Sequence, residues 1–253
     1  MKITILGCGP SYGVPSLYKG WGDCNFQNPK NERLRSAILI EHKGKNILID
    51  TPPEIRLELL RANIKKIDAL LYTHSHYDHM AGAEDVRKFM QKRNQLLDIY
   101  GVRYDLNVFK NQMKFVFDDP ESVASVKLNL IKMHIPFTVH GVLVLPIKQY
   151  HGKGLSVGYR IGDLAYSTDV KSMDKKGWEI LKGTKVWVLG CNNDYLNQKH
   201  LCLDEVLEWV QKIQPKRVYL THLGAKMDYE SLCKKLPLNI RPAYDGLQID
   251  INN

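Results

Sequence analysis

The amino-acid sequence predicts an α/β domain in which strands and helices are stacked in layers. Two observations support this prediction. Short apolar runs typical of β-strands come in groups, and segments with helical periodicity separate these groups. No linker, low-complexity tract or abrupt change of composition divides the chain, so we expect one domain over residues 1–253.

The first predicted strand is the N-terminal run KITIL, and further strands follow in groups. The predicted strands cover residues 2–6, 37–41, 46–50, 69–73, 141–149, 156–161, 164–167, 186–190 and 217–221. Helical patterns are found in residues 53–62, 83–91, 174–182, 203–213 and 229–235, and more weakly in residues 120–124. This order does not fit a simple alternation of one strand and one helix.

The region between residues 94 and 140 has the least regular pattern. Residues 99–102, IYGV, are predicted as a strand. The aromatic stretch FKNQMKFVF, residues 109–117, either lines a pocket or packs in the core. Elsewhere, LLYTH (70–74) and VYLTH (218–222) resemble each other, since both are apolar and end in Thr-His. This similarity predicts two related halves that meet at a shared site.

The composition is that of an ordinary globular protein, with 44% hydrophobic and 25% charged residues. No apolar run reaches the length of a transmembrane helix, and the N-terminus lacks the apolar segment of a signal peptide, so we expect no membrane partner. The five cysteines are scattered and never form a C-x-x-C pair. This predicts reduced thiols, buried as small side chains, in a cytoplasmic protein.

The net charge of +9 favours an anionic substrate. The basic residues are spread along the chain, without a run long enough to form a nucleic-acid-binding tail. Nucleic acid is therefore a partner that the charge permits but does not favour. The sequence leaves the oligomeric state open, a homodimer included.

The stretch THSHYDHMAG, residues 73–82, contains three of the nine histidines and one aspartate. Imidazole and carboxylate are both common metal ligands. His74 and His76 are two residues apart, so an extended backbone directs their side chains to the same side. Asp78 and His79 follow where the chain turns toward a predicted helix. This spacing predicts metal binding, with the first pair facing one metal and the second pair facing another.

Four more polar side chains each follow an apolar strand. Asp50 ends NILID, His151 follows VLVLPIKQY, Asp169 ends LAYSTD and His222 ends RVYLTH. Burying an aspartate or histidine at such a place is costly unless the side chain is paired or bound to metal. We therefore expect these residues to join the 74–79 cluster.

With these residues the chain resembles the metallo-β-lactamase-fold hydrolases. HSHYDH matches the H-x-H-x-D-H signature, and Asp50, His151, Asp169 and His222 match the first, third, fourth and fifth motifs in order. The segments GCGPSYGVP (7–15), WGDCNFQNPKNER (21–33) and PAYDGLQI (242–249) are similar to the PhnP-type branch, the phosphoribosyl cyclic phosphodiesterases. The resemblance implies an αβ/βα sandwich, two mixed sheets flanked by helices, with the site at one edge between them.

The resemblance also implies a role for each ligand candidate. The first metal would be held by His74, His76 and His151, and the second by Asp78, His79 and His222. Asp169 would bridge the two metals, and Asp50 would orient the ligands from outside the coordination shell. A helix cap or turn before Pro52 is the alternative for Asp50. Two divalent ions per chain, zinc or manganese with iron also compatible, would suit this set.

His200 stands in NQKHLCLDEVL, just before a predicted helix. PhnP-type enzymes and ribonuclease Z have a histidine in a comparable place, which implies that His200 contacts the phosphate or protonates the leaving oxygen. A solvent-exposed helix entry is the alternative. We take Asp50, Asp78 and His200 as candidate catalytic residues. Three other histidines lie in predicted turns or irregular sequence, and His140 rivals His151 as the third-motif ligand; they are His42, His134 and His140.

One departure from the PhnP pattern concerns an extra structural zinc. That site uses an N-terminal cysteine cluster and a histidine three residues after the last catalytic histidine. Here the corresponding region keeps Cys24, and the late position is Ala225. One thiol cannot form a four-ligand zinc site, so we expect the extra zinc to be absent and do not transfer the PhnP substrate directly.

The predicted reaction is hydrolysis of a phosphodiester by two metals about 3.5–4 Å apart. The expected substrate is a small cyclic phosphate, either a ribose cyclic phosphate or a cyclic nucleotide. Ribonuclease Z-like tRNA processing and hydrolysis of a thioester or lactone would share the same signature. A non-catalytic metal-binding interaction protein is the fourth possibility, but the complete ligand set argues against it.

Overall fold

The computed structural model describes residues 1–91, 96–119, 126–193 and 195–251, without the side chains of residues 88–91. Its strands form two mixed sheets. The first sheet has the order β15 (Gln248–Asp250), β1 (Lys2–Gly7), β2 (Ala37–His42), β3 (Lys45–Ile49), β4 (Ala69–Leu71), β5 (Leu97–Gly101) and β6 (Val126–Leu130). The second has the order β11 (Ser172–Met173), β8 (Val142–His151), β9 (Gly154–Ile161), β10 (Leu164–Ser167), β12 (Val186–Gly190), β13 (Arg217–Thr221) and β14 (Ile240–Pro242), and β7 (Phe137–Val139) pairs with β8.

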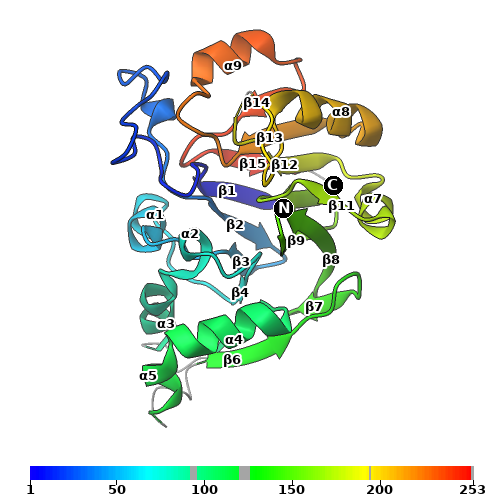
Figure 1. Cartoon of the computed structure of the whole chain (residues 1–253). Coiled ribbons are helices and arrows are strands. Elements are labelled where there is room, and N and C mark those ends of the chain that lie inside the picture. Colours follow the sequence, from blue (N-terminus) through cyan, green and yellow to red (C-terminus); the bar gives the residue numbers. More distant parts are fainter. Residues whose placement is uncertain (92–95, 120–125, 194, 252–253) are drawn as a thin grey trace.

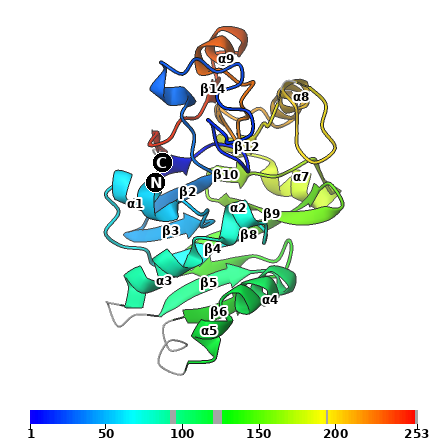
Figure 2. The ribbon, with the colours of Figure 1, turned by 60° about the vertical axis from the view of Figure 1, so that its left-hand side comes forward.

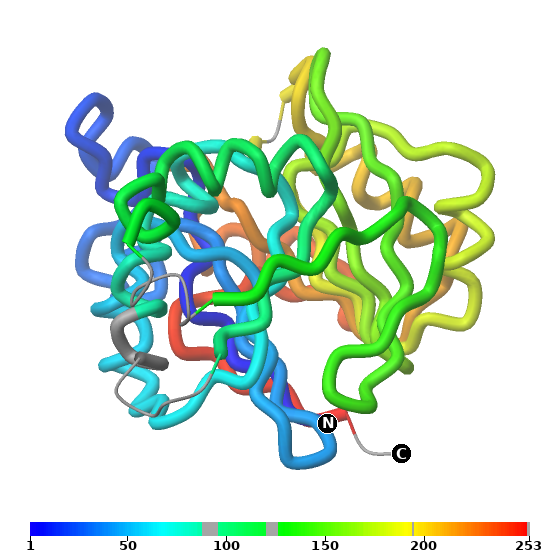
Figure 3. Tube along the Cα trace, turned by 90° about the horizontal axis from the view of Figure 1, so that it is seen from below, coloured from blue at the N-terminus to red at the C-terminus, as the bar shows by residue number. Residues whose placement is uncertain are grey.

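Helices cover the outer face of each sheet, which confirms the predicted αβ/βα arrangement (Figures 1 and 3). The helices of the first half are α1 (Ile55–Arg61), α2 (Tyr77–Met80), α3 (Ala83–Gln91), α4 (Arg103–Gln112) and α5 (Lys114–Phe117). The helices of the second half are α7 (Lys175–Leu181), α8 (Leu203–Ile213) and α9 (Tyr229–Lys235). In the described part of the chain, no helix is long and apolar enough to cross a membrane.

The two sheets repeat one pattern of strand directions. In the first sheet β1, β2 and β3 pair antiparallel, and β3 to β6 pair parallel. In the second sheet β8, β9 and β10 pair antiparallel, and β10, β12, β13 and β14 pair parallel. Parallel strands end at the same edge of a sheet, so each sheet brings several carboxyl ends together there.

The main core lies between the sheets. Because side chains alternate along a strand, Ile38 and Ile40 point into this core, while Leu39 points to the helices on the outer face. Ile47 and Ile49 alternate with Leu48 in the same way. Both faces of the inner strands are therefore buried, which explains why their sequences are continuous apolar runs.

The predicted strands are all found, and none of their ends is shifted by more than two residues. The helices 83–91, 203–213 and 229–235 have the predicted bounds. Residues 120–124 lie outside the described residues. The aromatic stretch packs in the core, where Phe109 and Val116 are buried. The helix α4 was not predicted, although Leu106, Phe109 and Met113 are buried at helical spacing.

The two ends of the chain lie side by side in the first sheet (Figure 2). The amino group of Met1 donates a hydrogen bond to the carbonyl of Ile251 over 3.1 Å, and β15 pairs with β1.

An unusual buried group, the side chain of Glu58 in α1, lies next to β1. The carboxyl oxygens of Glu58 have no hydrogen-bond partner among the described residues, and the half-buried Asp245 lies nearby.

The pKa shifts of these two carboxyl groups predict how the stability of the fold depends on pH. Burial, and then the neighbouring Asp245, raise the pKa of Glu58 well above its usual value. Burial also raises the pKa of Asp245 to about 6, although hydrogen bonds from the backbone of Leu34 and Cys8 lower it. The folded protein thus keeps protons that the unfolded chain releases, so stability is lost as the pH rises from about 4 through the folded-state pKa values.

We therefore expect Glu58→Gln to raise the melting temperature relative to the wild type more at pH 8 than at pH 5. The control is Glu230→Gln in α9, where the side chain is exposed. Thermal unfolding of both variants at the two pH values measures the effect. An equal change at pH 5 and pH 8 for Glu58→Gln would contradict this account.

Candidate metal centre

The candidate ligands gather where strands of both sheets end. Asp50 directly follows β3, His151 is the last residue of β8, and His222 directly follows β13. Asp50, Asp169 and His222 have φ angles of 67°, 49° and 59°, in the left-handed region that residues other than glycine rarely adopt. Such backbone strain is typical of functional sites, where the surrounding structure holds it in place.

The structure brings all seven predicted ligands into one cluster, in which every side chain except that of His76 is buried. Within each group that could hold a metal ion, the ligand atoms lie within 4.8 Å of one another. Two of these groups are His74 with His76 and His151, and Asp78 with His79 and His222. Asp169 belongs to a group with His74 and His79 and to another with His151 and His200. The clustering fits the predicted division into two metal sites with Asp169 between them.

Several hydrogen-bond acceptors around His79 converge on one point, which favours a cation there. In a neutral ring, Nδ1 of His79 carries the proton that it donates to Asp50 Oδ2 over 2.7 Å. Its Nε2 is then a bare acceptor, 3.3 Å from Asp78 Oδ2 and 3.1 Å from Asp169 Oδ2. Nε2 of His79 and Nε2 of His222 are buried and have no hydrogen-bond partner among the described residues. A divalent ion would satisfy these converging acceptors, so the residues fit a metal.

The pKa shifts of His79 and Asp169 also result from the close approach of carboxylates and imidazoles in the cluster. Burial lowers the pKa of His79, but Asp169, Asp50 and Asp78 outweigh it and raise that pKa well above its usual value. Burial likewise opposes ionisation of Asp169, but His222 and His79 hold its pKa well below its usual range. The negative potential of the carboxylates therefore favours positive charge at the centre of the cluster.

Asp50 contacts the cluster through hydrogen bonds with Thr73 and His79. Its carboxylate accepts hydrogen bonds from the Thr73 backbone N–H (2.8 Å) and hydroxyl (2.7 Å), besides that from His79. It thereby fixes both the start of the 73–79 segment and the orientation of the His79 ring. Helix α1 has Glu54 as its N-cap, so Asp50 does not cap it. This geometry supports the predicted orienting role.

Two other rings are held in the same manner. The backbone carbonyl of Lys199 accepts from Nδ1 of His151 over 2.9 Å, which leaves Nε2 of His151 facing Asp169 Oδ1 at 3.7 Å. The side-chain amide of Asn192 lies 3.1 Å from Nδ1 of His222. Asn192 and Lys199 therefore contact ligand candidates on both sides of the cluster. Neither contact was predicted from the sequence.

His200 lies beside the cluster rather than in open solvent. Its ring centroid is 4.7 Å from that of His151 and 4.8 Å from that of His222, and its Nδ1 is 3.6 Å from Asp169 Oδ1. Burial, and then His222, lower the pKa of His200 to about 3. The ring is therefore neutral near pH 7. A neutral imidazole can donate a hydrogen bond from one nitrogen but is not an acid with a spare proton.

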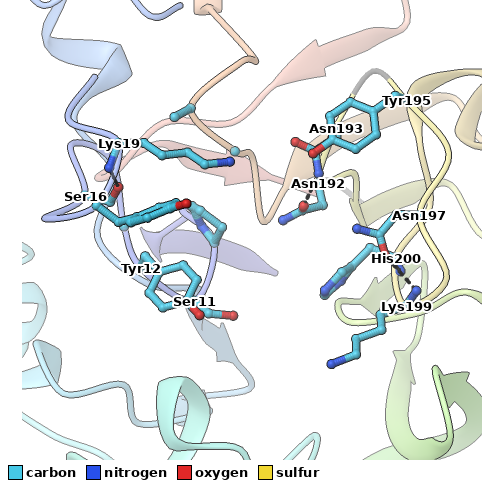
Figure 4. Close-up of a pocket in the computed structure, with 15 residues that line it drawn as sticks. Ser11, Tyr12, Ser16, Lys19, Asn192, Asn193, Tyr195, Asn197, Lys199 and His200 are labelled. Carbon is cyan, nitrogen blue, oxygen red and sulfur yellow. Dashed lines mark hydrogen bonds between the residues drawn. The ribbon is translucent and has the colours of Figure 1, made fainter. Parts of the chain in front are cut away.

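A cavity of about 550 Å³, named here the polar cavity, opens next to His200. Figure 4 shows its two walls: Tyr12 and Lys19 come from the N-terminal segment, and Asn193 and Lys199 come from the segment before α8. Its lining also includes Asn192, Tyr195 and Asn197. Amide and ammonium donors suit anionic oxygens and hydroxyl groups, and the tyrosine rings offer stacking surfaces.

The N-terminal wall is anchored by a buried arginine that the sequence did not single out. The guanidinium of Arg33, 1% exposed, donates to the carbonyl of Met227 over 2.6 Å and to that of Gly224 over 3.2 Å. It also lies 3.9 Å from the Cys24 sulfur. Arg33 and Cys24 thus occupy, with Ala225, the region in which the PhnP pattern would place its extra zinc ligands.

The remaining histidines are separate from the cluster. His42 ends β2 beside the turn at Lys43 and Gly44. Nε2 of His134 lies 2.9 Å from Asp174 Oδ2, at the start of α7. His140 is exposed, with Nε2 3.2 Å from Asp98 Oδ2. These positions favour His151 over His140 as the third-motif residue.

A dense His/Asp cluster at the edge between two mixed sheets, each covered by helices, defines the metallo-β-lactamase class of folds. Comparison with known families agrees, because residues 45–223 match the β-lactamase superfamily domain. The structure is similar to the crystal structure of a new diphosphatase from the PhnP family, with a TM-score of 0.92 and 31% identity over 99% of this chain and 98% of that one. The chain belongs to the metallo-β-lactamase superfamily, in its PhnP-type branch.

Two curated relatives are also similar. An octanoyltransferase of Porphyromonas gingivalis is 31% identical over 258 aligned residues, which cover all of this chain and 52% of that protein. The chain therefore spans about half the length of this relative. A ribonuclease Z of Clostridium kluyveri is 30% identical over 84 residues, which cover 32% of this chain and 22% of that enzyme.

Proposed function

We propose that the protein is a metal-dependent hydrolase that cleaves a phosphodiester or related phosphate ester in a small anionic substrate. The observation that carries the proposal is the pair of buried Nε2 atoms, on His79 and His222, without partners among the described residues. They face carboxylate oxygens of Asp78 and Asp169 at the edge of a cavity lined by amide and ammonium groups. The similarity to a PhnP-family diphosphatase supports phosphorus–oxygen hydrolysis.

Two divalent ions, held by the seven ligand candidates with Asp169 shared, would activate water and neutralise charge on the phosphate. The chain's own residues then have distinct tasks. Asp50 keeps the His79 ring oriented, and the Lys199 carbonyl does so for His151. Lys19 and Lys199 attract the anionic substrate into the polar cavity. His200, as a neutral ring, donates a hydrogen bond to a phosphate oxygen, which we favour over protonation of the leaving group.

The size of the polar cavity favours a small substrate. Its volume of about 550 Å³ lies in the range of small-molecule sites. Tyr12 and Tyr195 provide surfaces for a sugar or base, and the two lysines could also hold a second phosphate. Ribose cyclic phosphates, cyclic nucleotides and diphosphate esters are the candidates. The ribonuclease Z similarity covers a third of the chain, so tRNA processing remains the less supported proposal.

The octanoyltransferase name belongs to a protein of which this chain matches about half. An acyl substrate would make hydrolysis of a thioester or ester the competing activity at the same metal centre. The two reactions can be separated in one assay.

The test uses the full-length protein, stripped with a chelator and reconstituted with zinc or manganese. We expect the loaded protein to hydrolyse bis-p-nitrophenyl phosphate, the stripped protein to be inactive, and p-nitrophenyl octanoate or an octanoyl thioester to be cleaved slowly or not at all. Cleavage of the acyl substrates without cleavage of the phosphodiester would contradict the proposal. Absence of turnover with every metal would favour a non-catalytic metal-binding protein.

A further inference from the structure

A second cavity, of about 440 Å³ and named here the apolar cavity, also opens onto the predicted metal ligands. His74, Ser75 and His76 form one wall. The cavity shares no lining residue with the polar cavity among the described residues. The ring of His151 connects the two, since its centroid is 5.2 Å from that of His76 and 4.7 Å from that of His200. A group bound at the cluster therefore has a cavity on each of two sides.

The chemical character of the second cavity is opposite to that of the first. Apart from the wall of Ser75 and the two histidines, its surface comes mainly from apolar side chains of α4, of β9 and of the segment after β6. They are Val102, Val108, Met133, Leu155 and Val157, with Tyr104 beside them. The described residues that line it include no lysine, arginine or amide side chain. A second phosphate or a sugar would find few partners there, whereas burial of an apolar group would be favourable.

Asp105 supplies the one carboxyl group among the described residues that line this cavity, and it is already engaged. It is 4% exposed and lies beside Ser75, whose hydroxyl and backbone N–H favour its ionised form. It therefore holds the segment between His74 and His76 and does not offer a free charge to a ligand. Leu155 is 47% exposed, although it lies near the start of β9, four residues after the predicted ligand His151 ends β8. An apolar ligand would cover this side chain.

We infer that the substrate is a phosphate ester with two unlike arms, a polar arm in the polar cavity and an alkyl or acyl chain in the apolar cavity. The inference rests on the proposed function, because the phosphate must sit at the metal cluster for its two arms to reach both cavities. Val108 and Leu155 then determine specificity for the chain. Each buried methylene group should tighten binding about three- to fourfold until the cavity is filled.

The experiment is calorimetric titration of the metal-loaded protein with methyl, butyl and octyl phosphate. In the wild type we expect octyl phosphate to bind at least tenfold more tightly than methyl phosphate. Leu155→Asn and Val108→Asn should each reduce this ratio several-fold while leaving methyl phosphate affinity unchanged. The matched control is Leu143→Asn, since Leu143 is 54% exposed at the far end of the neighbouring strand β8 and does not line the cavity.

Equal affinity for methyl and octyl phosphate in the wild type would overturn the inference, as would a ratio that both asparagine variants leave intact. A ratio lost in Tyr12→Ser but kept in Leu155→Asn would place the chain in the polar cavity and overturn it too. Turnover of bis-p-nitrophenyl phosphate, measured on the same preparations, separates the two proposals. Turnover without a chain-length effect would leave the proposed function standing and refute the apolar arm. A chain-length effect without turnover would support an apolar binding site but refute the proposed hydrolysis.

Discussion

Asp169→Asn is expected to abolish hydrolysis and to prevent the binding of two metal ions per chain. Asp169 Oδ2 lies 3.1 Å from Nε2 of His79, a predicted ligand of the second metal, and its Oδ1 lies 3.7 Å from Nε2 of His151, a predicted ligand of the first, so its charge faces both predicted metal positions. Asparagine keeps the size of the side chain and tolerates the left-handed backbone at φ 49°. The substitution therefore removes charge without adding strain. Elemental analysis after reconstitution and the rate of bis-p-nitrophenyl phosphate hydrolysis are the measurements.

Asp50→Asn is the matched control for this prediction. Asp50 is equally buried, has a φ of 67°, and would undergo the same chemical change. It reaches the cluster through Thr73 and His79, so the loss should be the roughly 10–100-fold typical of residues that orient metal ligands. His200→Ala should keep both metals and lower turnover by roughly 10²–10³, the usual cost of removing one hydrogen-bond donor to the charge that develops in the transition state. If Asp169→Asn and Asp50→Asn had equal effects, Asp169 would not bridge two metals.

The sequence predicted the ligand candidates because their positions follow from simple rules. Apolar strands of limited length must end, and a histidine or aspartate at a buried strand end has few explanations other than pairing or metal binding. Parallel strands then bring such ends to one edge of each sheet. Thus Asp169 and His222, 53 positions apart in the sequence, lie 3.4 Å apart.

The walls of the two cavities could not be predicted in this way. Lys199 and Asn192 are anchored by contacts with His151 and His222, but their own segment has no periodicity that reveals this. Leu155 looks like an ordinary strand residue until β9 is placed beside α4. Side chains of this kind acquire their roles from tertiary contacts between distant segments, which no local pattern records.

Arg33 is another side chain whose role comes from tertiary contacts, and its replacement should have the largest effect on the stability of the fold. Its guanidinium donates to the carbonyls of Met227 and Gly224 and to the side-chain oxygen of Asn31 (3.1 Å). These acceptors are buried with it or partly buried, and Gly224 comes two residues after His222. Arg33 also exchanges backbone hydrogen bonds with Val14, close to Tyr12 in the wall of the polar cavity. One side chain therefore joins the N-terminal wall of the cavity to the loop that follows a predicted metal ligand.

Arg33→Met should destabilise the protein by about 3 kcal/mol, because several charge-assisted hydrogen bonds are lost and buried carbonyls are left without donors. This corresponds to a fall of about 6–12 °C in melting temperature for a chain of this size. Arg33→Lys should restore little, since an ammonium cannot reproduce the planar fork of donors.

The control is Arg61→Met. The partner of Arg61 is Glu32, 3.4 Å away on the surface, so this substitution should cost roughly 0–1 kcal/mol of stability. The loosened wall should also raise KM while the seven ligand candidates still hold their metals. A melting temperature no lower than that of Arg61→Met would show that the N-terminal wall is held by other contacts.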